Sequence, residues 1–132
     1  MKQSFGNLPS GEAVSLYTIS GGRLRAAVTD LGATLVSLWV DGVDVVLGCD
    51  DASGYLGNEG FLGAVVGRNA NRINGSAFPL SGRIIRLTPN EGENNLHSGP
   101  DCWNTRLWEV AEITDTAIRL RLDSPHGDQG FP

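Results

Sequence analysis

The chain has 132 residues, a net charge of −5 and a sequence pI of about 4.8. Its ten Lys and Arg residues are scattered, which argues against a nucleic-acid partner, because proteins that bind the phosphate backbone usually carry a basic patch. No apolar stretch approaches the ~18 residues that would suggest a membrane span. The N-terminus also lacks the apolar core of a signal peptide, so we expect a cytoplasmic protein with no membrane partner.

Short strands separated by turn residues dominate the pattern. The predicted strands comprise residues 14–19, 23–28, 33–40, 43–47, 77–80, 83–87, 105–113 and 117–123. Gly21-Gly22, Asp41-Gly42 and Ser81-Gly82 supply turn signals for three hairpins. Many short strands at close spacing predict an all-β fold, an antiparallel β-sandwich.

The remaining segments are expected to be less regular. Residues 50–56 predict a short helical turn, and residues 89–100 predict a long loop. Pro79 confines its strand to an edge or a bulge, because proline cannot donate a ladder hydrogen bond. Residues 124–132 are rich in proline and glycine, and a chain that stops in such a loop resembles a truncated protein.

Cys49 and Cys102 are the only cysteines, and they form no Cys-x-x-Cys pair. In a cytosolic chain this predicts two reduced, partly buried thiols, with a single disulfide as the alternative. The two cysteines and two histidines also lack the spacing of a metal-ligand cluster.

Two polar segments carry most of the functional information, namely residues 67–73 (Gly-Arg-Asn-Ala-Asn-Arg-Ile) and residues 94–99 (Asn-Asn-Leu-His-Ser-Gly). Both are too irregular for the middle of a strand. Arg72 offers a planar fork of donors, and His97 belongs to the side-chain type that titrates near neutral pH unaided. A polar ligand rich in hydroxyl groups would suit this pair.

These two segments resemble signatures of the aldose 1-epimerase family, also called galactose mutarotases. The first is similar to the family's Gly-Arg-x-Ala-Asn-Arg-Ile sequence, and the second to its Asn-x-Leu-His-Gly-Gly loop, with Ser98 in place of a glycine. Residues 47–56, 108–110 and 124–132 also resemble family segments. The resemblance implies that the fold is the first part of a galactose mutarotase-like supersandwich.

Members of this family are usually far longer than this chain. The resemblance therefore implies that residues 1–132 are the N-terminal part of a single such domain, apparently truncated. The family interconverts the α and β anomers of galactose- or glucose-type hexoses by acid/base ring opening, without a metal or another cofactor. Its general-acid histidine and general-base glutamate lie beyond Pro132, so we expect this chain alone to be inactive.

By the same resemblance, Asn71, Arg72 and His97 bind the hexose, and His97 also assists catalysis. The residues alone leave plainer roles open, namely an ion pair of Arg72 with Asp50 or Asp51 and an ordinary loop position for His97. We also expect Arg68 to brace the loop through backbone carbonyls, His126 to face solvent, and Asn94 and Asn95 to supply turn hydrogen bonds. Among the tryptophans, we expect Trp108 in the core and Trp39 in the core or on the surface. Trp103 is the tryptophan best placed to contact a ligand.

Two other functions remain open on the sequence. One is a non-catalytic carbohydrate-binding module that uses Arg72 and His97. The other is an oligomerising β-sandwich fragment, because exposed sheet edges can pair with a second copy of the chain. The sequence does not name the sugar, although the lack of a basic cluster near Arg72 argues against a sugar phosphate.

Overall fold

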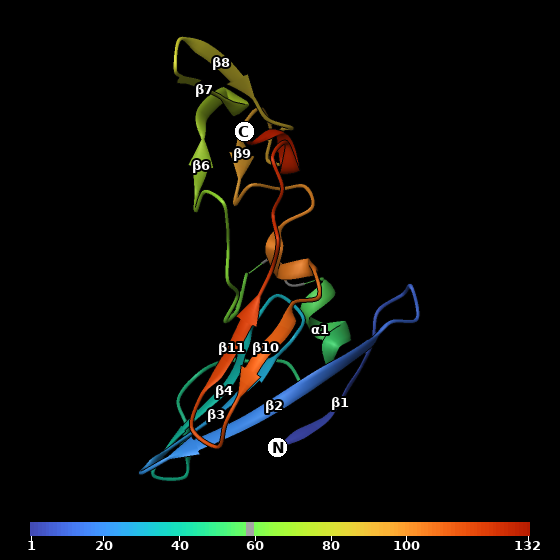
Figure 1. Cartoon of the computed structure of the whole chain (residues 1–132), viewed down its shortest axis with the longest axis vertical. Coiled ribbons are helices and arrows are strands. Elements are labelled where there is room, and N and C mark those ends of the chain that lie inside the picture. The colour runs from blue at the N-terminus through green and yellow to red at the C-terminus, as the bar shows by residue number, and fades with distance from the viewer. Residues whose placement is uncertain (58–59) are drawn as a thin grey trace. The chain divides into compact units, whose positions relative to one another are not determined.

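The computed structural model describes residues 1–57 and 60–132. Strands predominate in these residues, and the named strands pair in an antiparallel manner, which confirms the predicted all-β class (Figure 1). The chain divides into two compact units. One contains Met1–Val65 and Asn104–Leu122, and the other contains Val66–Trp103 and Asp123–Pro132.

The first unit contains an antiparallel sheet in which the strands follow chain order. Its members are β1 (Lys2–Asn7), β2 (Ala13–Gly21), β3 (Leu24–Thr29), β4 (Leu35–Val40) and β5 (Val43–Asp44). The predicted β2–β3 and β4–β5 hairpins are confirmed, and the turn at Asp41-Gly42 has φ values of 50° and 85°. The prediction of a strand over 43–47 was too long, because pairing with β4 ends at Asp44.

Strand β1 was absent from the sequence prediction. Its residues are mostly polar and exposed, and Phe5 is the buried member. The strand is held by pairing with β2 and by the contact of Phe5 with Tyr55, whose ring centroids lie 6.0 Å apart. A long-range contact of this kind leaves no local periodicity in the sequence.

The predicted helical turn is α1 (Ala52–Leu56), and Asp51 caps its N-terminus. The Asp51 carboxylate accepts hydrogen bonds from the backbone N–H groups of Ser53 and Gly54, at 2.9 and 3.3 Å. The hydrogen bond from the Ser53 hydroxyl, together with these two, lowers the pKa of Asp51. Asp51 is therefore a structural helix cap.

The core of the first unit lies between the sheet and α1. Its buried side chains are Phe5, Val14, Leu16, Ala27, Leu31, Val36, Ala52 and Tyr55. The Tyr55 hydroxyl accepts the backbone N–H of Cys49 at 2.9 Å. Trp39 is half-buried against this core, and the guanidinium of Arg25 lies 3.9 Å from its ring centroid.

The first unit also contains a hairpin formed by β10 (Glu109–Ile113) and β11 (Ile118–Arg121). Both strands are shorter than predicted, and residue 105, expected at the start of the first, lies in the 3₁₀ helix η2 (Trp103–Thr105). Trp108, expected in the core, is half-buried just before β10.

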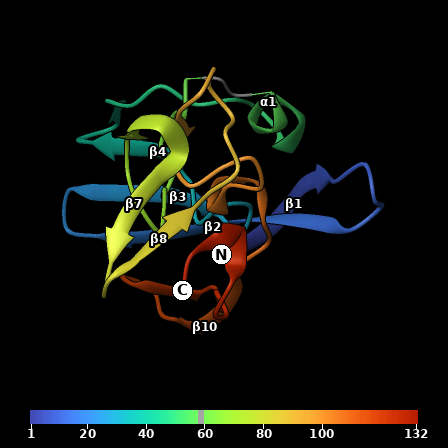
Figure 2. The same cartoon turned by 90° about the horizontal axis from the view of Figure 1, so that it is seen from above.

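The second unit consists of short elements joined by loops. They are β6 (Arg72–Ile73), η1 (Asn74–Ser76), β7 (Ala77–Leu80), β8 (Arg83–Arg86), β9 (Asn95–Leu96) and η3 (Asp128–Gly130). The predicted β7–β8 hairpin is confirmed, and Figure 2 shows its two strands side by side. Pro79 lies in β7 of this two-stranded pair. Each strand of such a pair is an edge strand, which is the position predicted for a proline that cannot donate a ladder hydrogen bond.

The predicted state of the cysteines is also confirmed. Cys49 is half-buried, Cys102 is buried, and no disulfide joins them. No helix in the described part of the chain is long and apolar enough to cross a membrane.

Candidate functional site

The two signature segments lie side by side because β6 pairs with β9. Arg72 is opposite Leu96, and Ile73 is opposite Asn95. Just beyond this short ladder, the backbone N–H of His97 donates to the carbonyl oxygen of Asn71 at 3.1 Å. The chain therefore brings together two loops that are about 25 positions apart in sequence.

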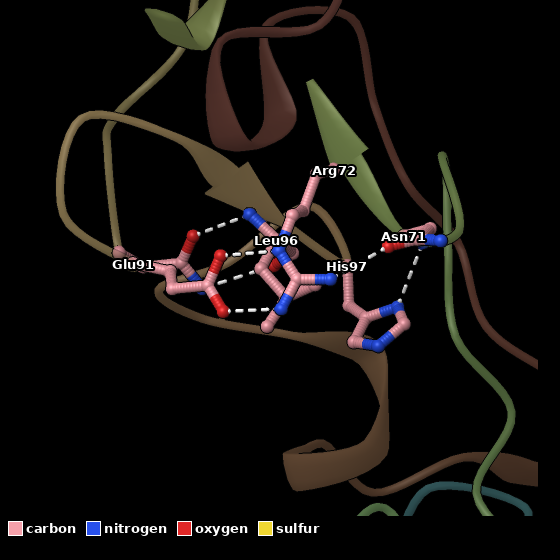
Figure 3. A network of polar contacts seen from close by, with 6 residues as sticks. Asn71, Arg72, Glu91, Leu96 and His97 are labelled. Carbon is pink, nitrogen blue, oxygen red and sulfur yellow. Dashed lines mark hydrogen bonds and ion pairs between the residues drawn. The ribbon is translucent and has the colours of Figure 1, made fainter. Parts of the chain in front are cut away.

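Asn71 connects the other two predicted site residues (Figure 3). Its backbone N–H donates to Nδ1 of His97 at 3.0 Å, and its side-chain Oδ1 accepts from Nη1 of Arg72 at 3.1 Å. Asn71 and Arg72 are exposed, and His97 is half-buried. The three predicted residues thus form one network, although their contact with a sugar stays a prediction.

The contact with Asn71 also fixes the tautomer of His97. Because Nδ1 accepts a hydrogen bond, the proton of the neutral imidazole resides on Nε2. Nε2–H is therefore a hydrogen-bond donor, and Arg72 supplies a cationic donor in the same network. Two donors of this kind suit the oxygen atoms of a hydroxyl-rich ligand.

Arg72 forms an ion pair, but its partner is Glu91 rather than the Asp50 or Asp51 that the sequence suggested. Nε of Arg72 donates to Oε2 of Glu91 at 2.5 Å, and Nη2 donates to Oε1 at 2.5 Å. This geometry is bidentate, with two parallel hydrogen bonds. Sequence reasoning missed Glu91, and its position in the loop before Asn94 is the signal that could have drawn attention to it.

The hydrogen bonds from Arg72 lower the pKa of Glu91 below its ordinary value of 4.5, and this effect outweighs the opposing effect of desolvation. A carboxyl whose pKa is lower in the folded state than in the unfolded state stabilises the fold at pH values above its unfolded-state pKa. This contribution is lost as the pH falls through the folded-state pKa. We expect Arg72→Ala to return the pKa of Glu91 towards 4.5, as measured by NMR titration of the side-chain carboxyl carbon. Arg83→Ala, a control at the exposed end of the β7–β8 hairpin, should leave it unchanged; an equal shift in both variants would refute the assignment.

Ser98, the residue that replaces the family glycine, locks the two loops together. Its Oγ accepts the backbone N–H of Asn69 at 2.8 Å and donates to the carbonyl oxygen of the same residue at 3.1 Å. The side chain is 1% exposed, and the backbone φ is 64°. The hydroxyl therefore supports a backbone conformation that ordinarily favours glycine.

Ser98→Ala should be more destabilising than Ser98→Gly. Both variants lose the contacts to Asn69, at a cost of about 1–3 kcal/mol for the buried groups left unpaired. Alanine also keeps the strain of a positive φ, which costs roughly 1–2 kcal/mol in an L-residue, whereas glycine relieves it. Urea denaturation of the two variants measures this order, and a more stable alanine variant would contradict it.

Two asparagines organise the 94–99 loop from within. Nδ2 of the fully buried Asn95 donates to the carbonyl oxygens of Thr88 and Gly99, at 2.8 and 3.0 Å. Oδ1 of Asn94 accepts the backbone N–H of Gly75 at 3.2 Å. The predicted hydrogen bonding within the turn is confirmed for Asn95, whereas the Asn94 side chain instead contacts Gly75 in η1.

Arg68 braces the unit through backbone carbonyls, as predicted. Its guanidinium donates to the carbonyl oxygens of Ser124, Pro125 and Pro132, at 2.7, 2.6 and 2.6 Å. Nε also donates to the Ser124 hydroxyl at 3.0 Å. Arg68 thus ties the first signature segment to residues 123–132.

The remaining candidates have structural positions. The six-membered ring of Trp103 packs against the backbone of Gly67, since a Cβ at Gly67 would lie 2.1 Å from Cζ3 of Trp103. His126 is exposed, as predicted.

A hollow of about 390 Å³ is lined by Arg68, Asn69, Ile73, Phe78 and Phe131. Neither Arg72 nor His97 is among its lining residues.

Comparison with known proteins identifies the family to which this chain is similar. The family model for aldose 1-epimerase matches residues 15–132. The aldose 1-epimerase of Escherichia coli K12 is 36% identical over 130 residues, which cover 94% of this chain and 38% of that protein. The galactose mutarotase of Bos taurus is 36% identical over 134 residues, covering 97% of this chain and 39% of that protein.

Solved structures show the same fold. A GalM/aldose epimerase homologue from C. elegans has a TM-score of 0.83 and 31% identity, covering 89% of this chain and 38% of that one. The galactose 1-epimerase of Lactobacillus acidophilus NCFM has a TM-score of 0.84 at 23% identity, covering 100% of this chain and 41% of that one. The predicted mutarotase-like fold is therefore confirmed, and the chain spans about two fifths of the length of these relatives. By the match of the family model over most of its length, this chain belongs to the aldose 1-epimerase family.

Proposed function

We propose that Asn71, Arg72 and His97 form part of the sugar site of an aldose 1-epimerase, and that residues 1–132 are the N-terminal part of a single domain. The whole protein would interconvert the α and β anomers of a galactose- or glucose-type hexose. The observation that carries this proposal is the single network in which Asn71 joins the Arg72 guanidinium to the His97 imidazole.

The chemistry requires proton transfer at two oxygen atoms. A base removes the proton of the anomeric hydroxyl while an acid protonates the ring oxygen, and the ring opens. Rotation about the bond next to the anomeric carbon is followed by closure on the other face. Each positioned acid or base contributes about 10²–10⁴-fold to the rate.

In this scheme Arg72 and Nε2–H of His97 hold and polarise the sugar oxygens. Arg72 keeps its charge throughout, and the pair would favour the build-up of negative charge on oxygen as the ring opens. The resemblance implies that the family's proton-transferring histidine and glutamate are not among residues 1–132, so the role proposed for His97 is assistance by hydrogen bonding. The isolated chain would then bind sugar weakly and lack measurable activity.

Polarimetry with fresh α-D-galactose and α-D-glucose tests the proposal. The 132-residue chain should leave the spontaneous rate of mutarotation unchanged. A chimera, in which this chain replaces the matching segment of the E. coli enzyme, should accelerate it. In the chimera, Arg72→Ala and His97→Ala should each lower kcat/KM at least about 100-fold, given the worth of such donors in a site.

The matched controls are Arg83→Ala and His126→Ala, which remove the same side-chain types at exposed positions away from the network. Both should retain the activity of the chimera. Full activity of the isolated chain would overturn the proposal, and so would full activity of the Arg72 and His97 variants in an active chimera.

A further inference from the structure

Glu91 occupies the edge of Arg72 that an anionic ligand would use. Its two carboxylate oxygens accept from Nε and Nη2, each at 2.5 Å. A phosphate or carboxylate ligand binds arginine in this same bidentate geometry. Such a ligand would have to displace Glu91 or bind beside its negative charge.

The loop holds Glu91 in this place. The N–H of Glu91 donates to the carbonyl oxygen of Asn94 at 3.1 Å, and the N–H of Asn94 donates back to Glu91 at 2.9 Å. Arg72 is fixed in turn by the pairing of β6 with β9. Both ends of the ion pair are therefore anchored by backbone hydrogen bonds.

The pair is nevertheless accessible from solvent. The side chains of Arg72 and Glu91 are 53% and 38% exposed. At neutral pH the two charges cancel, and Arg68, the other cation of the first signature segment, donates to the backbone carbonyls of residues 124, 125 and 132. A ligand at Arg72 thus meets a donor and an acceptor with no net charge between them.

A hydroxyl group fits this combination, because it donates one hydrogen bond and accepts others. It can accept from the guanidinium and donate to the Glu91 carboxylate at the same time. A phosphate dianion only accepts, so it gains the donors of Arg72 but is repelled by Glu91.

We infer that Glu91 is a specificity-determining residue, which neutralises Arg72 and reserves this site for uncharged, hydroxyl-bearing sugars over sugar phosphates. The inference rests on the proposed function in one respect only, namely that the ligand of the Arg72–His97 network is a sugar. Removal of the Glu91 carboxylate would convert the network into an anion site.

The test uses the ¹⁵N-labelled 132-residue chain and its Glu91→Gln variant. Each is titrated with D-galactose and with D-galactose 6-phosphate, and the Nε–Hε signal of Arg72 and the ring nitrogens of His97 are followed by NMR. Glutamine keeps the shape of the side chain and removes its charge. We expect Glu91→Gln to bind the sugar phosphate at least about tenfold more tightly than the unaltered chain, because one like charge has been removed at short range.

Two variants guard against a general effect of charge. Glu93→Gln removes an exposed carboxylate from the same loop and should leave phosphate affinity nearly unchanged. The double variant Glu91→Gln/Arg72→Ala should lose the gain, since the anion would have no guanidinium to bind. The backbone amide spectrum reports whether each variant remains folded.

The outcomes separate the two proposals. No gain of phosphate affinity in a folded Glu91→Gln variant, or an equal gain in Glu93→Gln, would overturn the inference. If Glu91→Gln gains affinity for the phosphate while D-galactose perturbs neither protein, the charge-selecting role of Glu91 is supported and the weak sugar binding proposed for this chain fails. If D-galactose binds and the gain is absent, the sugar site is supported and the role of Glu91 fails.

Discussion

Replacing Gly67 with alanine should destabilise the second unit by about 3 kcal/mol or more, since overpacking against a rigid ring is among the costly substitutions. A Cβ at this position would lie 2.1 Å from Cζ3 and 2.3 Å from Cε3 of Trp103. The indole cannot bend away as a flexible side chain could, so the loop or the tryptophan must move. Urea denaturation followed by tryptophan fluorescence measures the loss.

Gly57→Ala is the matched control for this prediction. Among the residues that the structure describes, leaving out the neighbours of Gly57 in the chain, no atom lies within 4 Å of a Cβ at this position, and its φ of −104° suits any residue. We expect a change within about 0.5 kcal/mol, as for ordinary surface substitutions. The double variant Gly67→Ala/Trp103→Ala should lose less than the sum of its single variants, because removal of the indole relieves the clash with the added methyl group. An unfolding midpoint of Gly67→Ala equal to that of the unaltered chain would disprove the steric argument.

Replacing Arg68 with alanine should release residues 123–132 from the first signature segment. The substitution removes four hydrogen bonds from a charged donor, to Ser124, Pro125 and Pro132. Hydrogen bonds of charged groups contribute about 1.5–3 kcal/mol each and are not additive, so we expect a total loss of about 3–5 kcal/mol. Hydrogen exchange and limited proteolysis should show residues 123–132 as newly accessible.

Arg68→Lys should expose residues 123–132 almost as much as Arg68→Ala does. The lysine ammonium, on a flexible side chain, cannot reproduce the planar guanidinium that donates to several carbonyls. Arg83→Ala, which removes the same charge from the exposed β7–β8 hairpin, should leave the protease pattern unchanged. Unaltered protection of residues 123–132 in Arg68→Ala would show that other contacts hold this segment.

Local turn chemistry explains which parts of the fold were predictable. Asp41-Gly42 and Ser81-Gly82 adopt positive φ in their hairpins, and pairs of these residue types predict such turns from the sequence. The β1 strand carries no such signal. Phe5 is its buried residue, so the strand shows no alternation of apolar and polar residues, and its hydrogen bonds are made with β2. Propensity reasoning could not supply that partner.

The candidate site shows the same division. Its residue types were evident from the two signatures, but their geometry depends on contacts across the chain. Asn71, His97 and Ser98 have φ values of 63°, 52° and 64°, which local preference would assign to glycine. These conformations are maintained by hydrogen bonds between the loops. The choice of Glu91 over Asp50 or Asp51 likewise follows from the pairing of β6 with β9, which sequence spacing does not reveal.

The contacts of Arg68 have a consequence for the order of events during biosynthesis. Its acceptors lie 56, 57 and 64 positions downstream, so the ribosome makes the guanidinium several seconds before the carbonyls that bind it, at about 5–20 residues per second. During that interval the nascent chain contains the first signature segment without the acceptors of Arg68, and residues 94–99 are added part of the way through it. The bracing of residues 67–73 by Arg68 is therefore complete only after residues 124–132 have been synthesised.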